Sequence, residues 1–156
     1  MNIKILFMDV DGTLTDGGIF IGPNGEAFKR FNAKDGYGIN NVLKQHKIIP
    51  AIVTGRKSRM LEIRCSELGI IDLIQDSKNK IASCSEILNK HGMTFGDAAF
   101  IGDDLNDLDV MKKVGCVGCP SDAVKEVVEI ADFVSRKKGG EGAVRDFIDW
   151  IVQQMQ

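Results

Sequence analysis

The sequence lacks the features that would place a protein in a membrane, on nucleic acid or in a secretory pathway. No apolar run approaches the ~20 residues needed to cross a bilayer. The segment 3–8 shows none of the basic, apolar and small-residue regions of a signal peptide. Twenty basic residues against 22 acidic ones give a net charge of −2, which offers no basic footprint for nucleic acid. We therefore expect a cytoplasmic protein that binds neither nucleic acid nor membranes.

The sequence also has too few paired cysteines for a structural zinc site. It contains four cysteines and only one CxxC pair, Cys116 and Cys119. A zinc site needs further ligands, and no second pair is present. In the cytoplasm cysteines stay reduced, so we expect all four to be reduced and interpret Cys116 and Cys119 as structural.

The chain has no room for a large second domain. Its 156 residues suffice for one hydrophobic core. There is no internal repeat and no low-complexity linker, so we expect a single domain over 1–156. The stretch 137–142, rich in lysine and glycine, looks the most flexible, and it opens a C-terminal tail over about 137–156.

Short β-rich runs alternate with longer amphipathic stretches along the chain. This alternation predicts an α/β fold, a doubly wound parallel sheet with helices on both faces. The strands are predicted at 3–8, 50–53, 72–75, 98–101, 116–118 and 132–134. The helices are predicted at 36–46, 57–69, 79–91, 105–113, 122–130 and 141–154.

One segment interrupts this alternation directly after the first strand. Two short β-rich runs flank the turn Gly22-Pro23-Asn24-Gly25, which predicts a β-hairpin insertion over about 18–31. Ile19, Ile21 and Phe28 are apolar on a hairpin that is otherwise expected to be exposed, which fits a buried interface. The alternative is a hairpin packed on its own domain.

Acidic residues follow two of the predicted strands. Asp9 and Asp11 come directly after the first strand, and Gly12 lets the chain turn there. Asp103 follows the strand 98–101 in Gly102-Asp103-Asp104-Leu105-Asn106-Asp107. Ligands of open α/β sheets bind at the carboxyl edge, and oxygen-only ligands suit Mg²⁺. A polar strand end and a helix N-cap are the simpler alternatives, although one carboxylate is enough for a cap.

Two further polar groups follow the strands between these acidic residues. Thr54-Gly55-Arg56 stands at a strand-to-helix junction, where a hydroxyl and backbone N–H groups can hold a phosphate. Lys80 opens the helix after the strand 72–75. Each group alone has an ordinary structural explanation, as a helix start or a solvated lysine. The ordered set after four strands indicates a phosphate-handling site.

With these four motifs in order, the sequence resembles the haloacid dehalogenase superfamily of phosphotransferases. The resemblance extends over about 3–146. Within the superfamily it is similar to small enzymes without a cap domain that dephosphorylate eight- and nine-carbon sugar acids. The segments that carry this closer likeness are 31–39, 54–58 and 139–146. The implied substrate is 3-deoxy-D-manno-octulosonate 8-phosphate, since Arg56 stands where the nine-carbon relatives tend to have Glu.

The resemblance implies a role for each site residue. Asp9 is expected to be the nucleophile and Asp11 the general acid and base. Thr54 and Lys80 are expected to hold the phosphoryl oxygens. The metal Mg²⁺ is expected on the Asp9 carboxylate, the Asp11 backbone carbonyl and Asp103. The expected substrate contacts are Asn32, Ala33, Lys34, Asp35, Gly36, Gly55, Arg56, Arg64, Asn106 and Arg145.

The resemblance also implies a homotetramer. Without a cap, neighbouring chains would wall each active site, the hairpin would join its symmetry mates, and the tail with Arg145 would close on the substrate. Two positions depart from the family pattern: Asn40 stands where Arg is common, and Asp146 where Glu is common.

Three other interpretations stay open at this stage. The enzyme alternative is a phosphatase for ketodeoxynononate 9-phosphate or N-acylneuraminate 9-phosphate. A phosphoacceptor receiver domain also combines acidic residues, Thr and Lys on a doubly wound sheet, but it lacks Asp-x-Asp-Gly-Thr at the first strand. The third is a binding relative without catalysis, against which the complete set of candidate catalytic groups argues.

Overall fold

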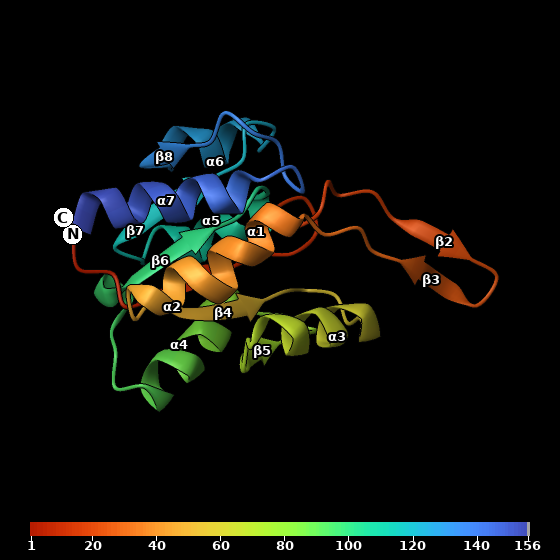
Figure 1. Cartoon of the computed structure of the whole chain (residues 1–156), viewed down its shortest axis with the longest axis horizontal. Helices are drawn as coiled ribbons and strands as arrows, with labels where there is room; N and C mark the ends of the chain where they lie inside the picture. Colours follow the sequence, from red (N-terminus) through yellow and green to blue (C-terminus); the bar gives the residue numbers. More distant parts are fainter. Residues whose placement is uncertain (156) are drawn as a thin grey trace.

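A computed structural model describes residues 1–155, and six of its strands form one parallel sheet (Figure 1). The strands follow the order β5-β4-β1-β6-β7-β8. They are β1 (Ile5–Met8), β4 (Ile49–Val53), β5 (Asp72–Ile74), β6 (Ala98–Ile101), β7 (Cys116–Cys119) and β8 (Phe133–Val134). From the central β1 the chain adds β4 and β5 on one side of the sheet. It then crosses to the other side of β1 and adds β6, β7 and β8. The predicted doubly wound sheet is confirmed.

Helices cover both faces of this sheet (Figure 1). They are α1 (Ala33–Tyr37), α2 (Leu43–Gln45), α3 (Arg59–Leu68), α4 (Lys80–Lys90), α5 (Leu108–Met111), α6 (Lys125–Ile130) and α7 (Ala143–Met155). A π-helical turn over Gly38–Val42 joins α1 to α2. Short 3₁₀ turns over Phe95–Asp97 and Leu105–Asp107 precede β6 and α5.

The first helix begins three residues before its predicted start. The side chain of Asn32 accepts a hydrogen bond from the backbone N–H of Lys34 at 2.8 Å, which makes Asn32 the N-cap of α1. Asn is among the preferred N-cap residues because its short side chain satisfies a free helical donor. The predicted helix start at residue 36 did not include this cap.

Alternating strand residues divide the core into two layers. Leu6 and Met8 of β1 face one layer, whereas Ile5 and Phe7 face the other. The first layer takes its helical side chains from the α1–α2 segment, α3 and α7, and the second takes them from α4, α5 and α6. Strands covered on both faces need apolar residues at consecutive positions, which explains why β1 and β6 are apolar throughout.

The hairpin consists of the antiparallel strands β2 (Phe20–Gly22) and β3 (Gly25–Phe28), and it extends away from the sheet (Figure 1). The rings of Phe20 and Phe28 stack with centroids 4.4 Å apart. Ile21 is nevertheless 70% exposed and Phe28 is 55% exposed. The apolar side chains of the hairpin therefore remain largely uncovered within one chain.

The stretch 137–142 is packed against the loop after β1, contrary to the flexible appearance of its sequence. The backbone N–H of Gly140 donates to the carbonyl oxygen of Thr13 at 3.0 Å. A Cβ atom at Gly139 would collide with the backbone of Gly12. The glycines of this stretch therefore allow two backbones to approach closely, which is a use of glycine distinct from mobility.

The cysteines lie in the core. All four are unpaired and buried. Cys116 and Cys119 belong to different core layers, on opposite faces of β7, so they do not form a metal-binding pair. Among residues 1–155, no helix has both the length and the apolar character needed to cross a bilayer.

Asp35 joins α1 to α7 inside the protein. Its side chain is 1% exposed, and Oδ1 accepts a hydrogen bond from the backbone N–H of Arg145 at 2.8 Å. The other oxygen, Oδ2, is buried without a hydrogen-bond partner among the described residues. Burial raises the pKa of Asp35 to about 6, against the lowering effects of that N–H and of Lys137. Its ionisation is therefore linked to folding.

We expect Gly118→Ala to destabilise the protein. A Cβ atom at Gly118 would lie 2.7 Å from the ring of the fully buried Phe147, so the core would be overpacked. The free energy of unfolding should fall by about 1–3 kcal/mol in urea titrations. In the control Gly96→Ala, the nearest atom would be 3.6 Å away, and the change should stay within about 0.5 kcal/mol. Equal stabilities of the two variants would contradict this packing.

We expect Asp35→Asn to change how stability depends on pH. A raised folded-state pKa favours folding below the ordinary value of 3.8, and this contribution is lost as pH rises through about 6. Asn keeps an acceptor oxygen for Arg145 but cannot ionise. Its free energy of unfolding relative to wild type should therefore rise by on the order of 1 kcal/mol from about pH 5 to about pH 7. A difference from wild type that is identical at both pH values would refute the linkage.

Candidate active site

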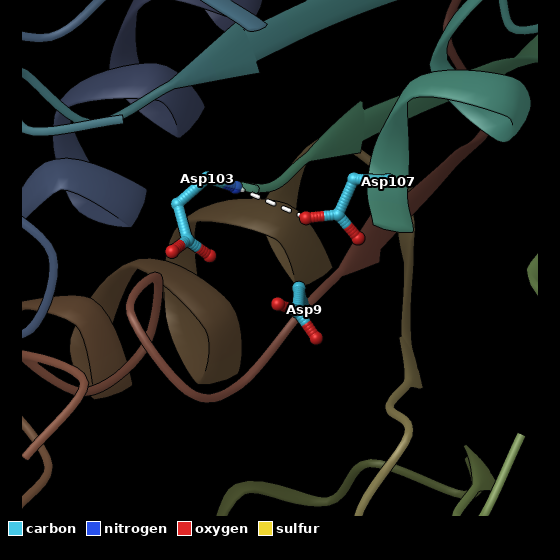
Figure 2. A group of neighbouring side chains, drawn as sticks. All are labelled: Asp9, Asp103 and Asp107. Atoms are coloured by element: carbon cyan, nitrogen blue, oxygen red, sulfur yellow. Dashed lines mark hydrogen bonds between the residues drawn. The ribbon is translucent and has the colours of Figure 1, made fainter. Parts of the chain in front are cut away.

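Three carboxylates converge at the carboxyl edge of the sheet (Figure 2). Asp9 follows β1, Asp103 follows β6, and Asp107 ends the 3₁₀ turn after it. One oxygen from each lies within 4.8 Å of the others. Because β1 and β6 are adjacent parallel strands, their ends bring residues 94 positions apart, by the difference of the two numbers, into one small volume.

Lys80 supplies a positive charge to this cluster from another element. It is the first residue of α4, and its side chain is 6% exposed. Nζ donates to Asp9 Oδ1 at 2.9 Å and to Asp107 Oδ1 at 2.6 Å. Burial opposes the charged form, but Asp9 and Asp107 outweigh it and raise the pKa of Lys80. Lys80, which was expected to hold phosphoryl oxygens, therefore lies beside Asp9 and Asp107.

Two glycines and a threonine shape the acidic turns. Gly12 has a φ of 89°, and a Cβ atom there would collide with the Asp103 carboxylate. Gly102 likewise leaves room for the carboxylate of Asp107. Thr13 Oγ1 donates to Asp103 Oδ1 at 2.9 Å. The small residues therefore let two acidic loops approach each other, and the hydroxyl orients one carboxylate.

Asp107 braces the second acidic turn from inside. Its Oδ2 accepts from the backbone N–H groups of Asp103 at 3.1 Å and Asp104 at 3.3 Å (Figure 2 draws the first). Asp104, in contrast, is exposed and accepts from the backbone N–H of Leu105 at 2.7 Å. Asp104 thus acts as the N-cap, whereas Asp107 adds an ion pair with Lys80 that the sequence did not reveal.

The crowding of carboxylates changes their proton affinity. Burial and the charge of Asp107 raise the pKa of Asp9 to about 6, although Lys80 lowers it. Burial and the charge of Asp9 raise the pKa of Asp103 to about 7, although the Thr13 hydroxyl lowers it. Burial and the neighbouring negative charges thus favour the protonated form of both carboxyl groups.

The donor set fits a hard divalent cation. One lysine faces three carboxylates, so the cluster carries an excess of negative charge, and all its ligand atoms are oxygens. Mg²⁺ prefers such oxygen ligands and takes only one or two carboxylates, with water or phosphate completing its shell. Asp9 and Asp103 are the expected carboxylate ligands, while both oxygens of Asp107 already accept hydrogen bonds.

The side chain of Asp11 faces the hairpin. Its Oδ1 accepts from Lys29 Nζ at 2.7 Å, and Lys29 Nζ also donates to Glu26 Oε2 at 3.2 Å. The same Glu26 oxygen lies 3.2 Å from an Arg56 guanidinium nitrogen. An unbroken chain of ion pairs therefore joins the loops after β1 and β4 through the hairpin.

Three further predicted site residues lie after β4 and β6. Thr54 follows β4 and is buried, with its backbone N–H donating to the carbonyl oxygen of Ile74 at 3.0 Å. Gly55 follows it and has open space around its Cα, where an added Cβ atom would lie 3.8 Å from the nearest atom. Asn106 lies in the 3₁₀ turn before α5 and is exposed.

The other expected substrate contacts gather around α1. Gly36 leaves room for the guanidinium of Arg64, which also lies over the ring of Phe31 at 5.8 Å from its centroid. Arg145 lies over Tyr37 and donates from Nε to Asp149. Ala33 and Lys34 form the exposed first turn of α1, next to the buried Asp35. None of these side chains has a contact with Asp9, Asp103 or Asp107 among those the structure describes.

The sequence interpretation missed Lys29 and Glu26. Both belong to the hairpin segment, and neither follows a strand of the main sheet. Their proximity to Asp11 depends on the return path of the hairpin. No local sequence pattern predicts that the hairpin returns toward Asp11.

Comparison with known proteins places this geometry in a family. The family model described as haloacid dehalogenase-like hydrolase matches residues 47–148. A 3-deoxy-D-manno-octulosonate 8-phosphate phosphatase of Escherichia coli K12 is 45% identical over 151 residues, which is 97% of this chain and 80% of the relative.

Solved structures agree with that relationship. The phosphatase of the same name from Yersinia pestis superposes with a TM-score of 0.93 at 42% identity, over 97% of this chain and 82% of the other. The phosphatase from Moraxella catarrhalis was solved in complex with magnesium ion, phosphate ion and a KDO molecule. It superposes with a TM-score of 0.90 at 35% identity, over 99% of this chain and 94% of the other. The chain belongs to the haloacid dehalogenase-like hydrolase family.

Proposed function

We propose that this chain is a Mg²⁺-dependent phosphatase that hydrolyses 3-deoxy-D-manno-octulosonate 8-phosphate. The observation that carries the proposal is the buried Asp9 carboxylate, which is held by Lys80 and flanked by Asp103 at the edge where ligands of such sheets bind. Relatives at 42–45% identity carry the name of this activity. Membership of a hydrolase family removes the reason to consider a receiver domain.

The residues divide the chemistry between them. An oxygen of Asp9 forms a bond to phosphorus while the bond from phosphorus to the sugar oxygen breaks. Asp11 gives its proton to that departing oxygen. A water molecule then attacks phosphorus, Asp11 takes the proton of the water, and the carboxylate of Asp9 is released with inorganic phosphate.

Charge balance explains why the nucleophile needs these neighbours. A carboxylate and a phosphate repel each other, so positive charge must lie beside both. Lys80 contacts Asp9 at 2.9 Å, and Lys80 and Thr54 would hold the phosphoryl oxygens. Bound Mg²⁺ would add charge stabilisation for the transferring phosphoryl group. Its ligands would be Asp9, Asp103 and the backbone carbonyl of Asp11.

Substrate selection is proposed for residues around this centre. Arg56 is 45% exposed and provides the planar fork that suits a carboxylate of the sugar acid. The residues proposed to complete the substrate site are Asn32, Ala33, Lys34, Asp35, Gly36, Gly55, Arg64, Asn106 and Arg145. Asp35 would act within the fold, through α1 and α7, because its side chain is buried.

We further propose that the chain forms one cap-free domain over 1–156 and assembles as a homotetramer. The exposed apolar side chains of the hairpin support this assembly, since contiguous exposed apolar surface marks interaction sites. The four unpaired cysteines are compatible with a cytoplasmic enzyme. The proposed substrate places it in the synthesis of a lipopolysaccharide precursor.

The tetramer predicts a specific sensitivity of the hairpin. Light scattering should give the mass of four chains for wild type, and Ile21→Lys should reduce it because a charge would enter the apolar interface. The control Ile71→Lys changes a side chain that is 84% exposed outside the hairpin, and it should remain tetrameric. A monomeric wild type, or an Ile21→Lys variant that stays tetrameric, would be inconsistent with hairpin assembly.

The function predicts a ranking of substrates in a phosphate-release assay with Mg²⁺. The specificity constant for octulosonate 8-phosphate should exceed those for ketodeoxynononate 9-phosphate and N-acylneuraminate 9-phosphate. EDTA should abolish turnover, and Mg²⁺ should restore it. Preference for a nine-carbon substrate would establish the alternative, and no turnover on a broad panel of phosphate esters would indicate a binding relative.

Matched variants complete this assay. Asp9→Asn removes the nucleophile and should lower turnover by at least about a thousandfold. Asp104→Asn changes a neighbouring carboxylate but keeps an N-cap, so its activity should stay close to that of wild type. Full activity of Asp9→Asn would refute the mechanism.

A further inference from the structure

The hairpin places a buried lysine against the proposed general acid. Lys29 lies just after β3, and its side chain is 3% exposed although the hairpin extends from the sheet. Nζ contacts Asp11 Oδ1 at 2.7 Å and Glu26 Oε2 at 3.2 Å. A buried ammonium group is costly unless it is paired, and these two carboxylates provide its pairing.

This contact restricts where the Asp11 carboxylate can lie. Asp11 stands in the turn that Gly12 permits, and its side chain is 20% exposed. A short ion pair to a buried cation selects one rotamer among those open to a loop residue. Proton transfer requires the donor to lie within hydrogen-bond reach of the leaving oxygen, so the position of this carboxylate affects the rate.

Glu26 holds Lys29 from the other side. Its side chain is 13% exposed, and its Oε2 is shared between Lys29 and Arg56. Lys29 is thus fixed at two points, one on the loop after β1 and one within the hairpin. The hairpin therefore has a role at the active site besides presenting apolar side chains to other chains.

We propose that Lys29 is a positioning residue for the phosphatase reaction, which fixes the position of the Asp11 carboxylate beside the site and is itself held by Glu26. The inference rests on the proposed function of Asp11 as general acid. A competing role for Lys29 is a direct contact with the phosphate, because an ammonium group near the site would also attract that anion.

Two substrates distinguish these roles. The leaving oxygen of a sugar phosphate is an alkoxide and needs a proton, whereas 4-nitrophenolate leaves without one. The ratio kcat/KM reports on steps through formation of the aspartyl-phosphate, before water attacks. Loss of a positioned general acid should therefore lower kcat/KM for octulosonate 8-phosphate much more than for 4-nitrophenyl phosphate. Loss of a phosphate contact should lower both equally.

The experiment measures kcat/KM on octulosonate 8-phosphate and on 4-nitrophenyl phosphate, with Mg²⁺, for wild type, Lys29→Met and Glu26→Gln. Lys29→Met should lose at least about tenfold more on the sugar phosphate than on the aryl phosphate, since general acids contribute about 10²–10⁴-fold. Glu26→Gln, which keeps the Lys29 and Asp11 side chains but weakens the hold on Lys29, should show the same selective loss to a smaller extent. It keeps the proposal testable if Lys29→Met fails to fold.

Controls separate this effect from folding and assembly. Arg30→Met removes a neighbouring cation that is 59% exposed and 3.6 Å from Asp16, and it should match wild type on both substrates. Light scattering should show the same mass for all variants. In an Asp11→Asn background, Lys29→Met should cause no further selective loss, because the group it positions is absent.

The outcomes distinguish this inference from the proposed function. Failure of wild type to hydrolyse the sugar phosphate would refute the proposed substrate, and the same comparison would then use any alkyl phosphate that wild type hydrolyses. Equal losses on the alkyl and aryl esters, or no loss in Lys29→Met, would overturn the positioning role. A selective loss on the alkyl ester that disappears in the Asp11→Asn background would establish it.

Discussion

The active site depends on one buried ion-pair arrangement, in which Lys80 lies between Asp9 and Asp107. The three side chains are at most 8% exposed, so water provides little screening of their charges. Removing one partner from such a group typically costs about 3–5 kcal/mol, because the remaining charge stays buried without compensation. The same arrangement keeps a nucleophilic carboxylate beside positive charge. The geometry that holds the site together is thus the geometry that its chemistry requires.

The fold delivers these groups through its topology. Asp9 and Asp103 follow the adjacent strands β1 and β6, and Lys80 begins the helix that follows β5. All three come from the carboxyl edge, where strand ends supply rigid positions for functional side chains. The glycine-rich stretch 137–142 packs against the backbone of the loop after β1 and supports that loop. The hairpin segment adds Lys29 and Glu26, which contact the site through Asp11.

The sequence was sufficient to predict the sheet, the helices and the residues that follow strands. Apolar runs such as 98–101 and acidic residues directly after them are local signals, and parallel topology converts them into a shared edge. Residues whose role depends on tertiary return paths could not be predicted in this way. Lys29 and Glu26 resemble ordinary hairpin charges. Asp35 was expected to contact the substrate, and nothing local indicates that α7 buries it. Asn32 carries a local cap signal, because Asn is among the preferred N-cap residues.

Asp9 is the proposed acceptor of the phosphoryl group. Rapid quenching during turnover, followed by borohydride reduction, converts an aspartyl-phosphate into homoserine, which mass spectrometry of the N-terminal peptide locates. We expect homoserine at position 9, formed only when octulosonate 8-phosphate and Mg²⁺ are both present. Steady phosphate release with an unmodified Asp9, or homoserine at another position, would contradict it.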